Sequence, residues 1–294
     1  MENLRGAAMM VAAMAAFAIE DMFIKRLSVD ISTGQILMML GAGGALVFGL
    51  LASRRGARLF SPVLLTRPVL LRNLGEVIGT MGFVTAIALT PLSSASAILQ
   101  ATPLAVTLGA AVFMQEAVGW RRWSAILVGF AGVLLIIRPG LEGFEPASLF
   151  AVQGVIGLAI RDLATRAVPR EIGAMQLSAY AFGLLVPTGL VLLLVQGHSL
   201  TTPLPAQWGQ FAGALVLGIV GYYSIVAAMR LGEVAVVTPF RYSRLIFAII
   251  IGVTVFGERP DSLTLTGAAL IVGSGLYTLL REARLHRRAR RAAR

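Results

Sequence analysis

Residues 234–256 read VAVVTPFRYSRLIFAIIIGVTVF. This mostly apolar stretch is long enough for a helix to cross a bilayer, because about 20 residues span the hydrocarbon core. It nevertheless contains Pro239, Arg241 and Arg244. A guanidinium at membrane depth costs at least ~2.5 kcal/mol, so these arginines are expected to face protein or a water-filled cavity. Their spacing of three places them on one helical face, and Pro239 predicts a kink because it removes a backbone donor. The stretch is therefore predicted to form one wall of a polar cavity within a membrane.

The composition places the whole chain in a membrane. Of 294 residues, 57% are hydrophobic and only 13% are charged, too few for a soluble surface. There is no cysteine, and His198 and His286 lie outside the apolar runs, so neither a metal site nor a cofactor is expected. The net charge is +11, and the arginine-rich tail 281–294 supplies much of it. Such a tail is typical of a cytoplasmic anchor beside anionic lipid, and no nucleic-acid partner is expected.

Ten apolar runs of suitable length can be marked, which predicts an all-α membrane protein of ten transmembrane helices. The first run has no signal-type cleavage site and is expected to be a membrane helix. The runs cover residues 4–24, 33–52, 68–89, 93–114, 120–137, 148–167, 173–196, 208–229, 234–256 and 262–280.

The distribution of Lys and Arg predicts the orientation. With both termini in the cytoplasm, 18 basic residues lie on the cytoplasmic side and four lie outside, and three are within runs. This asymmetry agrees with the positive-inside rule. The expected location is the bacterial inner membrane, crossed many times, with both termini cytoplasmic.

The sequence also repeats at a nearly constant offset. Residues 18–21 (AIED) return as 159–162 (AIRD), and Glu116 returns as Glu258. Five runs per copy is an odd number, so the second copy enters the membrane from the opposite side, as in inverted-repeat transporters. The predicted domains are residues 1–142, residues 143–281 and a basic tail of residues 282–294. Coincidence in an apolar chain is the alternative.

These features resemble the EamA branch of the drug/metabolite transporter superfamily. The resemblance rests on the five-plus-five arrangement, the Gly257-Glu258 pair that ends the ninth run, and the following 267–271 (GAALI). The first copy matches the family pattern less closely, because Gln115-Glu116 and Ala125 occupy the corresponding positions. Within the branch the chain looks most like bacterial exporters of amino acids, particularly aromatic ones.

Glu76 is the most informative carboxylate, because it lies well inside the third run and must be protonated, paired or hydrated there. It either forms a structural ion pair with an arginine such as Arg72, or holds a substrate amine or a proton. Arg161 and Asp162 are interpreted as a compensating pair, although adjacent residues point in different directions on a helix and are expected to need separate partners. Arg241 and Arg244 either pair with Glu76 or Asp162, or bind a substrate carboxylate as a guanidinium fork does.

Two sets of candidates follow. The predicted substrate-binding residues are Glu76, Thr80, Gln100, Tyr222, Arg241, Tyr242 and Arg244. The predicted cavity or coupling residues are Glu20, Asp21, Asp162 and Tyr180. Glu20 and Asp21 are alternatively exposed carboxylates near Lys25 and Arg26.

The predicted function is export of small metabolites, most of all amino acids, by alternating access between two inverted halves. No ATP-binding motif is present, and opposite intramembrane charges suit a zwitterion. The expected partners are a small-molecule substrate and the lipid bilayer, and the sequence does not indicate an oligomeric state. A multidrug or other metabolite exporter is the first alternative. An intramembrane enzyme is disfavoured because no run contains a histidine. A channel is disfavoured because its ring of charges or carbonyls usually comes from an oligomer, and the inverted repeat argues against that.

Overall fold

The computed structural model describes residues 2–57, 59, 62–116, 119–169, 171–231 and 234–292, except the side chains of residues 230, 234, 235 and 282–292. Arg58, Arg170 and the side chains of the basic tail, residues 282–294, lie outside this description. The described part is mostly helical, with short turns and loops between the helices, and contains no strand. The longer helices are α1 (Glu2–Leu27), α2 (Thr33–Arg54), α3 (Arg67–Leu89), α6 (Trp120–Ile137), α7 (Leu149–Thr165), α8 (Ala174–Val195), α9 (Pro205–Leu231) and α12 (Ser262–Ala292).

The two remaining apolar runs are broken helices. The fourth run forms α4 (Leu92–Leu99) and α5 (Thr102–Phe113), with Pro103 just after the break. The ninth forms α10 (Val234–Val237), the 3₁₀ segment η3 (Thr238–Tyr242) and α11 (Ser243–Phe256). Pro239 lies in η3, so the predicted irregularity is present. Proline cannot donate the backbone bond that a continuous α-helix needs.

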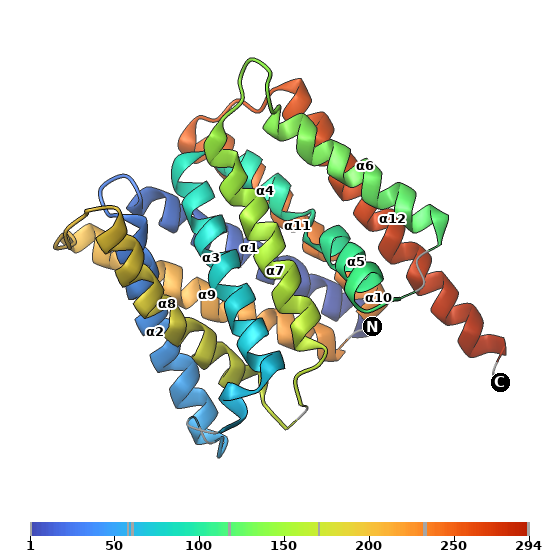
Figure 1. Cartoon of the computed structure of the whole chain (residues 1–294), viewed down its shortest axis with the longest axis horizontal. Coiled ribbons are helices and arrows are strands. Elements are labelled where there is room, and N and C mark those ends of the chain that lie inside the picture. Colours follow the sequence, from blue (N-terminus) through green and yellow to red (C-terminus); the bar gives the residue numbers. More distant parts are fainter. Residues whose placement is uncertain are drawn as a thin grey trace. The chain divides into compact units, whose positions relative to one another are not determined.

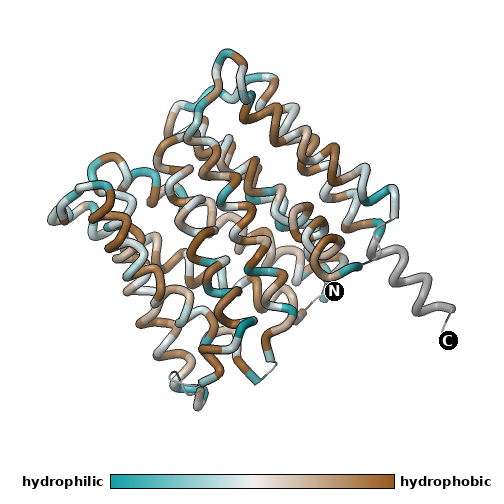
Figure 2. Tube along the Cα trace, in the orientation of Figure 1, coloured by the Kyte–Doolittle hydropathy of each residue, from teal (hydrophilic) through white to brown (hydrophobic). Residues whose placement is uncertain are grey.

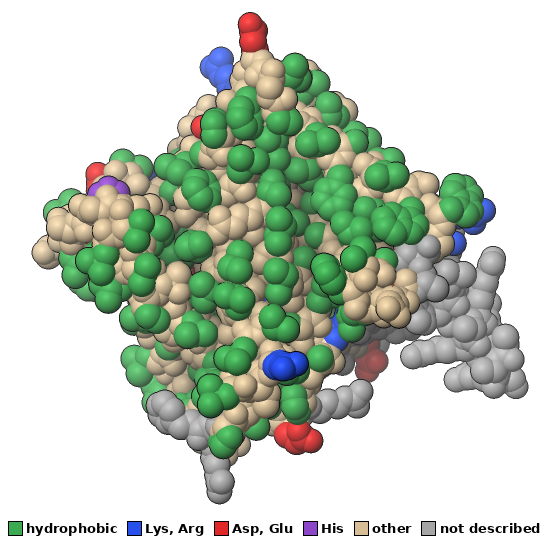
Figure 3. Space-filling view, viewed as in Figure 1, with side chains coloured by type: hydrophobic (Ala, Val, Ile, Leu, Met, Phe, Trp, Pro, Cys, Tyr) green, Lys and Arg blue, Asp and Glu red, His purple; other side chains and the backbone are tan. Residues whose placement is uncertain are grey.

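Nine helical stretches in the described residues are long and apolar enough to cross a membrane by length and composition. The hydropathy trace shows apolar residues along these helices and polar residues gathered mainly at their ends (Figure 2). The face seen in Figure 3 carries mostly hydrophobic and uncharged side chains, as expected where lipid is the solvent. Helix α3 is 23 residues long but is not among the nine. Arg72, Asn73 and Glu76 lower its mean hydropathy.

The chain forms two compact units, and each combines stretches from both halves of the sequence. Unit 1 comprises Met1–Ile19, Pro91–Pro146 and Leu217–Arg294. Unit 2 comprises Glu20–Thr90 and Ala147–Val216. The sequence order therefore does not separate the two units, because each is assembled from helices far apart in the chain.

Antiparallel helix pairs build each unit. In unit 2, α2 packs on α8 and α3 packs on α7, and in unit 1, α6 packs on α12 (Figure 1). The α3–α7 pair is so close that a side chain at Gly157 would collide with the backbone of Gly79. Gly82 meets Gly154 farther along α3, so the two helices run in opposite directions. Small residues at such a crossing allow helix backbones to approach.

Candidate functional site

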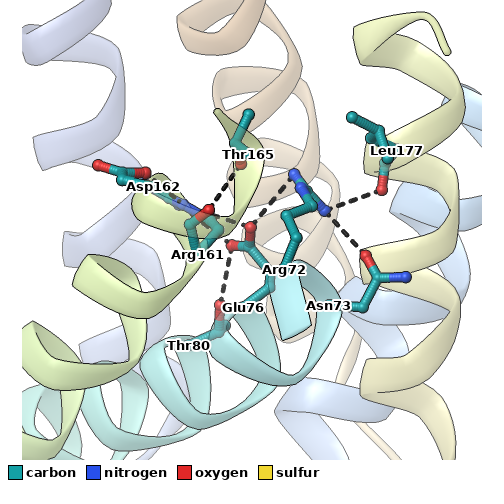
Figure 4. A network of polar contacts seen from close by, with 8 residues as sticks. All are labelled: Arg72, Asn73, Glu76, Thr80, Arg161, Asp162, Thr165 and Leu177. Atoms are coloured by element: carbon teal, nitrogen blue, oxygen red, sulfur yellow. Dashed lines mark hydrogen bonds and ion pairs between the residues drawn. The ribbon is translucent and has the colours of Figure 1, made fainter. Parts of the chain in front are cut away.

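Unit 2 contains a network of charged side chains centred on Glu76 of α3 (Figure 4). The Glu76 carboxylate lies 3.5 Å from Nη2 of Arg72, one turn earlier on the same helix. It also lies 3.4 Å from Nη1 of Arg161 on α7. Thr80 Oγ1 donates a hydrogen bond of 3.4 Å to the same carboxylate. The structure therefore contains the predicted ion pair between Glu76 and Arg72. It adds a second partner, Arg161, that the sequence did not indicate.

Arg161 and Asp162 are paired with each other, contrary to the expectation that adjacent residues need separate partners. Nε and Nη2 of Arg161 both lie 2.8 Å from Oδ1 of Asp162. The arginine side chain is long enough to bend back along the helix, while Nη1 remains on Glu76. Two guanidinium groups and two carboxylates thus share one site, and opposite charges offset the cost of burial.

The same network reaches a third helix. Nη1 of Arg72 donates to the backbone oxygen of Leu177 on α8 at 3.0 Å and to Oδ1 of Asn73 at 3.1 Å. On α8, Gln176 Nε2 donates a hydrogen bond of 2.6 Å to the hydroxyl of Tyr180. Tyr180, one of the predicted cavity residues, lies about one helical turn after Leu177. Charged hydrogen bonds that join α3, α7 and α8 favour a role in holding these helices together.

Unit 1 brings the two helix breaks side by side. Gln100, which follows the last residue of α4, donates from Nε2 to the backbone oxygen of Arg241 in η3 at 3.3 Å. Gln100 and Arg241 come from different halves of the sequence. Backbone at a helix break has carbonyl and amide groups that a continuous helix would satisfy internally. Such breaks are where secondary transporters build substrate sites.

Arg244 lies at the second residue of α11, directly after the break. Its guanidinium carbon is over the ring of Phe17 on α1, 5.3 Å from the ring centroid. The ring packs against α9, where a Cβ at Gly221 would lie 3.0 Å from it. Tyr222 is the next residue of α9 and is half-buried. The positive end of the α11 dipole and the arginine charge act at the same place, which favours an anion there.

Tyr242 is almost fully buried, with 6% of its surface exposed. Its hydroxyl has no hydrogen-bond partner within the described part of the chain, and its ring occupies space that a side chain at Gly275 would fill. An unpaired buried hydroxyl costs about 1–3 kcal/mol. Tyr242 therefore carries a buried polar group that packing alone does not explain. In the sequence it lies between Arg241 and Arg244.

The carboxylates at the end of α1 do not match the interpretation as exposed charges. Asp21 has only 2% of its surface exposed, and Glu20 is half-buried. Nearby, Lys25 donates from Nζ to the backbone oxygens of Ile87 and Thr90 at 3.1 and 2.5 Å. Lysine at a helix C-terminus satisfies carbonyls that lack an intrahelical donor.

Glu258, which supported the family resemblance, has a defined structural role. Its carboxylate accepts hydrogen bonds from the backbone N–H groups of Leu92 and Ser93 at 2.5 and 3.0 Å. It also accepts one from the Ser93 hydroxyl at 2.7 Å. These donors belong to the first turn of α4, so Glu258 caps this helix from outside it.

One ion pair lies outside the membrane-spanning segments. Arg138, after α6, is paired with Asp261, before α12. The hydrogen bond from Arg138 and those from Thr264 lower the pKa of Asp261 to about 2. The Asp261 carboxylate also accepts the Thr264 N–H at 2.9 Å, which caps the start of α12.

The predicted site residues therefore fall into two groups. Unit 2 holds Glu76, Thr80, Asp162, Tyr180, Glu20 and Asp21. Unit 1 holds Gln100, Tyr222, Arg241, Tyr242 and Arg244. The predicted pairing of Glu76 with Arg241 or Arg244 joins residues of different units and stays a prediction. Sequence reasoning missed Phe17, and no local pattern marks it, since its contact with Arg244 depends on packing across the chain.

Apolar helices of membrane-spanning length, discontinuous helices and charges at membrane depth define a multi-pass membrane transport protein. The model of the EamA-like transporter family matches residues 4–138 and 146–280, and the chain belongs to this family. The resemblance in the sequence is thereby confirmed.

Several known transporters are similar to this chain. It is 26% identical over 216 residues to an S-adenosylmethionine uptake transporter of Rickettsia conorii, covering 72% of this chain and 71% of that protein. It is 29% identical over 225 residues to a riboflavin transporter of Vibrio cholerae, covering 76% and 75%. It is 26% identical over 279 residues to the pseudopaline exporter CntI of Pseudomonas aeruginosa, covering 91% and 93%. A solved crystal structure at 18% identity has a TM-score of 0.60, covers 95% of this chain and 98% of that one, and supports the fold.

Proposed function

We propose that this protein is a secondary transporter that exports small amphipathic metabolites bearing a carboxylate, with amino acids, including aromatic ones, as its cargo. The proposal places cargo binding at the helix breaks of unit 1 and alternating access between two inverted repeats, residues 1–142 and 143–281. It also places the protein in the bacterial inner membrane with both termini in the cytoplasm.

One observation carries the proposal. The breaks of the fourth and ninth runs lie together, joined by the hydrogen bond from Gln100 to the Arg241 carbonyl, and Arg244 follows at the start of α11. A guanidinium fork matches the two oxygens of a carboxylate. A helix N-terminus strengthens the preference for an anion. Helices α2 and α8 are the second run of each predicted repeat, and α6 and α12 are the fifth. Corresponding helices of inverted repeats cross the membrane in opposite directions, and both pairs are antiparallel.

The expected carboxylate on the cargo is inferred from the position of Arg244 directly after the helix break. Glu76 has guanidinium partners within unit 2, from Arg72 and Arg161, so a substrate amine would have to displace one of them. The named cargoes of the relatives are chemically diverse, and the names include both uptake and export.

The test is transport by the purified protein in proteoliposomes. Radiolabelled phenylalanine, tryptophan, threonine, S-adenosylmethionine, riboflavin and a cationic drug are offered with and without a pH gradient. The variants are Arg244→Ala and, as the matched control, Arg259→Ala, which removes an exposed arginine from the loop after α11.

Saturable amino-acid transport by the wild type and Arg259→Ala, reduced in Arg244→Ala, supports the proposal, and stimulation by the gradient indicates proton coupling. Transport of the drug alone, with every amino acid inert, contradicts the amino-acid cargo and favours a multidrug exporter.

A further inference from the structure

We propose that unit 2 holds one acyl chain of a bilayer phospholipid in a groove between α2 and α9. The groove lies at the end of the unit where these two helices begin. The chain occupies the groove, and the polar end of the lipid lies at the loop that precedes α9. The proposal goes beyond the proposed function, because it depends neither on the cargo nor on the helix breaks of unit 1.

Two adjoining hollows form this groove. The first, of about 400 Å³, is lined by Gln35, Met38 and Met39 of α2, the loop 200–203 and Trp208 of α9. The second, of about 210 Å³, is lined by Met39, Leu40, Trp208, Phe211, Ala212 and Leu215. Because Met39 and Trp208 line both hollows, the two are parts of one groove, here named the α2–α9 groove. All of these residues belong to unit 2.

The groove follows the direction of α9 into the membrane-spanning part of the helix. Leu215, at its far end, lies ten residues after Pro205, the first residue of α9. At about 1.5 Å per residue, the groove extends about 15 Å from the start of the helix. The first hollow alone has the size of sites that hold small molecules, which are about 300–1,000 Å³. An extended apolar chain fits this length better than a compact solute does.

The lining is apolar along its length and polar at one end. Among the described residues that line the groove, none is charged, and the polar ones are Gln35, Thr201 and Thr202. The amide of Gln35 is engaged within the protein, because Nε2 donates to the Thr201 carbonyl at 2.6 Å and Oε1 accepts from the Thr201 N–H at 2.9 Å. The exposed Thr201 and Thr202 side chains add hydroxyl groups at this end, which can donate to ester or phosphate oxygens. A charged ligand would find no counter-charge along the rest of the lining.

Two buried glutamines hold the loop wall of the groove in place. Gln35 binds both backbone groups of Thr201. Gln207 accepts from the Leu204 N–H at 2.8 Å and donates from Nε2 to Asp30 at 3.0 Å. The loop is thus fastened to α2 and to the turn before it. A wall that is ordered beforehand reduces the entropy lost when a ligand binds.

The surroundings of the groove indicate a lipid as its occupant. Trp208 lies in the first turn of α9 with 53% of its surface exposed, and tryptophan is enriched where helix ends meet the lipid headgroups. Leu204 and Val216, before and beyond the groove, are also exposed, so the groove is continuous with the apolar surface that the bilayer covers. Water would lack hydrogen-bond partners along its apolar part. Lipid chains are as apolar as the lining, so dispersion contacts and shape hold the chain rather than the hydrophobic effect.

Trp208 allows the groove to be observed directly. The background protein is Trp120→Phe/Trp123→Phe, which removes the other two tryptophans of the chain, both exposed on α6. In dodecyl maltoside it is titrated with phosphatidylcholine that carries bromine atoms near the carboxyl end of one chain. Quenching of Trp208 fluorescence is followed against the lipid fraction of the micelle, and native mass spectrometry of the same samples counts the bound lipids.

Two variants in this background separate the groove from the rest of the surface. Ala212→Leu adds a larger side chain to the lining of the second hollow. Ala206→Leu makes the same change at an exposed position of the same helix that does not line the groove. Since both alanines are exposed, neither variant overfills the core of unit 2.

We expect quenching that saturates at a low lipid fraction in the background protein and in Ala206→Leu, with one lipid retained in the mass spectrum. Ala212→Leu should raise the lipid fraction at half-maximal quenching at least about three-fold, because several carbon contacts of the chain are lost together. Retention of the single lipid should fall in that variant. Phenylalanine, offered as a cargo, should not displace the lipid.

Quenching that rises in proportion to the lipid fraction, equally in all three proteins, reports lipid at the general surface and overturns the proposal. Saturable quenching that Ala212→Leu leaves unchanged overturns it as well, because the chain then lies elsewhere. Displacement of the lipid by phenylalanine makes the groove a cargo site and contradicts its assignment to lipid. The proposed function fails separately: a protein that retains the lipid in the groove but transports no amino acid keeps this site and loses the proposed cargo.

Discussion

The two units hold their arginines at membrane depth in different ways. In unit 2, Arg161 is bound by the carboxylates of Glu76 and Asp162, and their charges offset its own. In unit 1, Arg244 lies over the uncharged ring of Phe17 at the start of a helix. A carboxylate offsets the charge of a guanidinium, and the face of a ring attracts it through the ring quadrupole. The contacts of a charged side chain at membrane depth therefore bear on its role as much as its position in the sequence does.

The largest expected effect is on the network of unit 2. Glu76→Gln removes the carboxylate that Arg72 and Arg161 share. Because removing one partner of a buried ion pair leaves uncompensated charge, we expect a loss of about 3 kcal/mol of stability, seen as a large fall in Tm. The double variant Glu76→Met/Arg161→Met should recover part of it. A Glu76→Gln protein with normal Tm and lost cargo binding would instead assign Glu76 to the cargo site.

The second prediction concerns the helix crossing beneath that network. Gly157→Ala places a methyl group against the backbone of Gly79. Since neither backbone can yield without separating α3 from α7, we expect a loss of about 1–3 kcal/mol. The control is Gly183→Ala on α8, where no neighbouring atom lies within 4 Å of the added Cβ. That change should be neutral or stabilising, by at most about 1 kcal/mol. Equal thermal stability of the two variants would contradict the close crossing.

The third prediction concerns the Glu258 carboxylate of unit 1, which caps the start of α4. Glu258→Gln weakens the cap on α4, because an amide oxygen replaces the carboxylate that accepts from Leu92 and Ser93. We expect a loss of about 1 kcal/mol, measured as a lower Tm, with little change in the KM for phenylalanine transport. If affinity falls while Tm is retained, the cap acts on the site rather than on the helix.

The smallest expected effect lies outside the membrane-spanning segments. Asp261 has a pKa of about 2 in the folded protein, below its ordinary value near 3.9. A lowered folded pKa stabilises the protein above the ordinary value, and the contribution is lost as the pH falls through that of the folded state. The side chain is 48% exposed, so Asp261→Asn should cost less than about 1 kcal/mol at pH 7. Its difference in Tm from wild type should shrink between about pH 4 and pH 2, and a constant difference would contradict the ion pair.

Much of the fold could be predicted from the sequence. The bounds of the apolar runs agree with the helices to within a few residues at most ends, as α6 (Trp120–Ile137) shows. Run length and polar ends are local properties, and they are imposed by the bilayer. Pro239 likewise marked the interruption of the ninth run, whereas the interruption next to Pro103 was not predicted. The run that forms α3 was also recognised as a membrane helix, because its polar residues are concentrated near one end and the rest of the run is apolar.

The partners of the charged residues could not be predicted in the same way. Arg161 reaches Glu76 across 85 positions of sequence, and Phe17 meets Arg244 across most of the chain. Both contacts depend on which helices pack together, and apolar periodicity does not specify the packing partner. Arg161 and Asp162 pair with each other, as their interpretation as a compensating pair predicted, but the expectation that each needs a separate partner was wrong. Helical spacing describes where side chains start, but a long arginine can still reach its neighbour.

The assignment of the cargo site to unit 1 is tested by comparing Arg244→Ala with Glu76→Gln in one proteoliposome assay of phenylalanine transport, with Tm measured on the same preparations. The account predicts that Arg244→Ala raises KM at least about ten-fold, the value of one lost charge-assisted contact, and keeps its Tm. It predicts that Glu76→Gln lowers Tm, while the protein that remains folded keeps its KM. The reverse pattern, with cargo affinity dependent on Glu76 and not on Arg244, would contradict the assignment of the cargo site to unit 1.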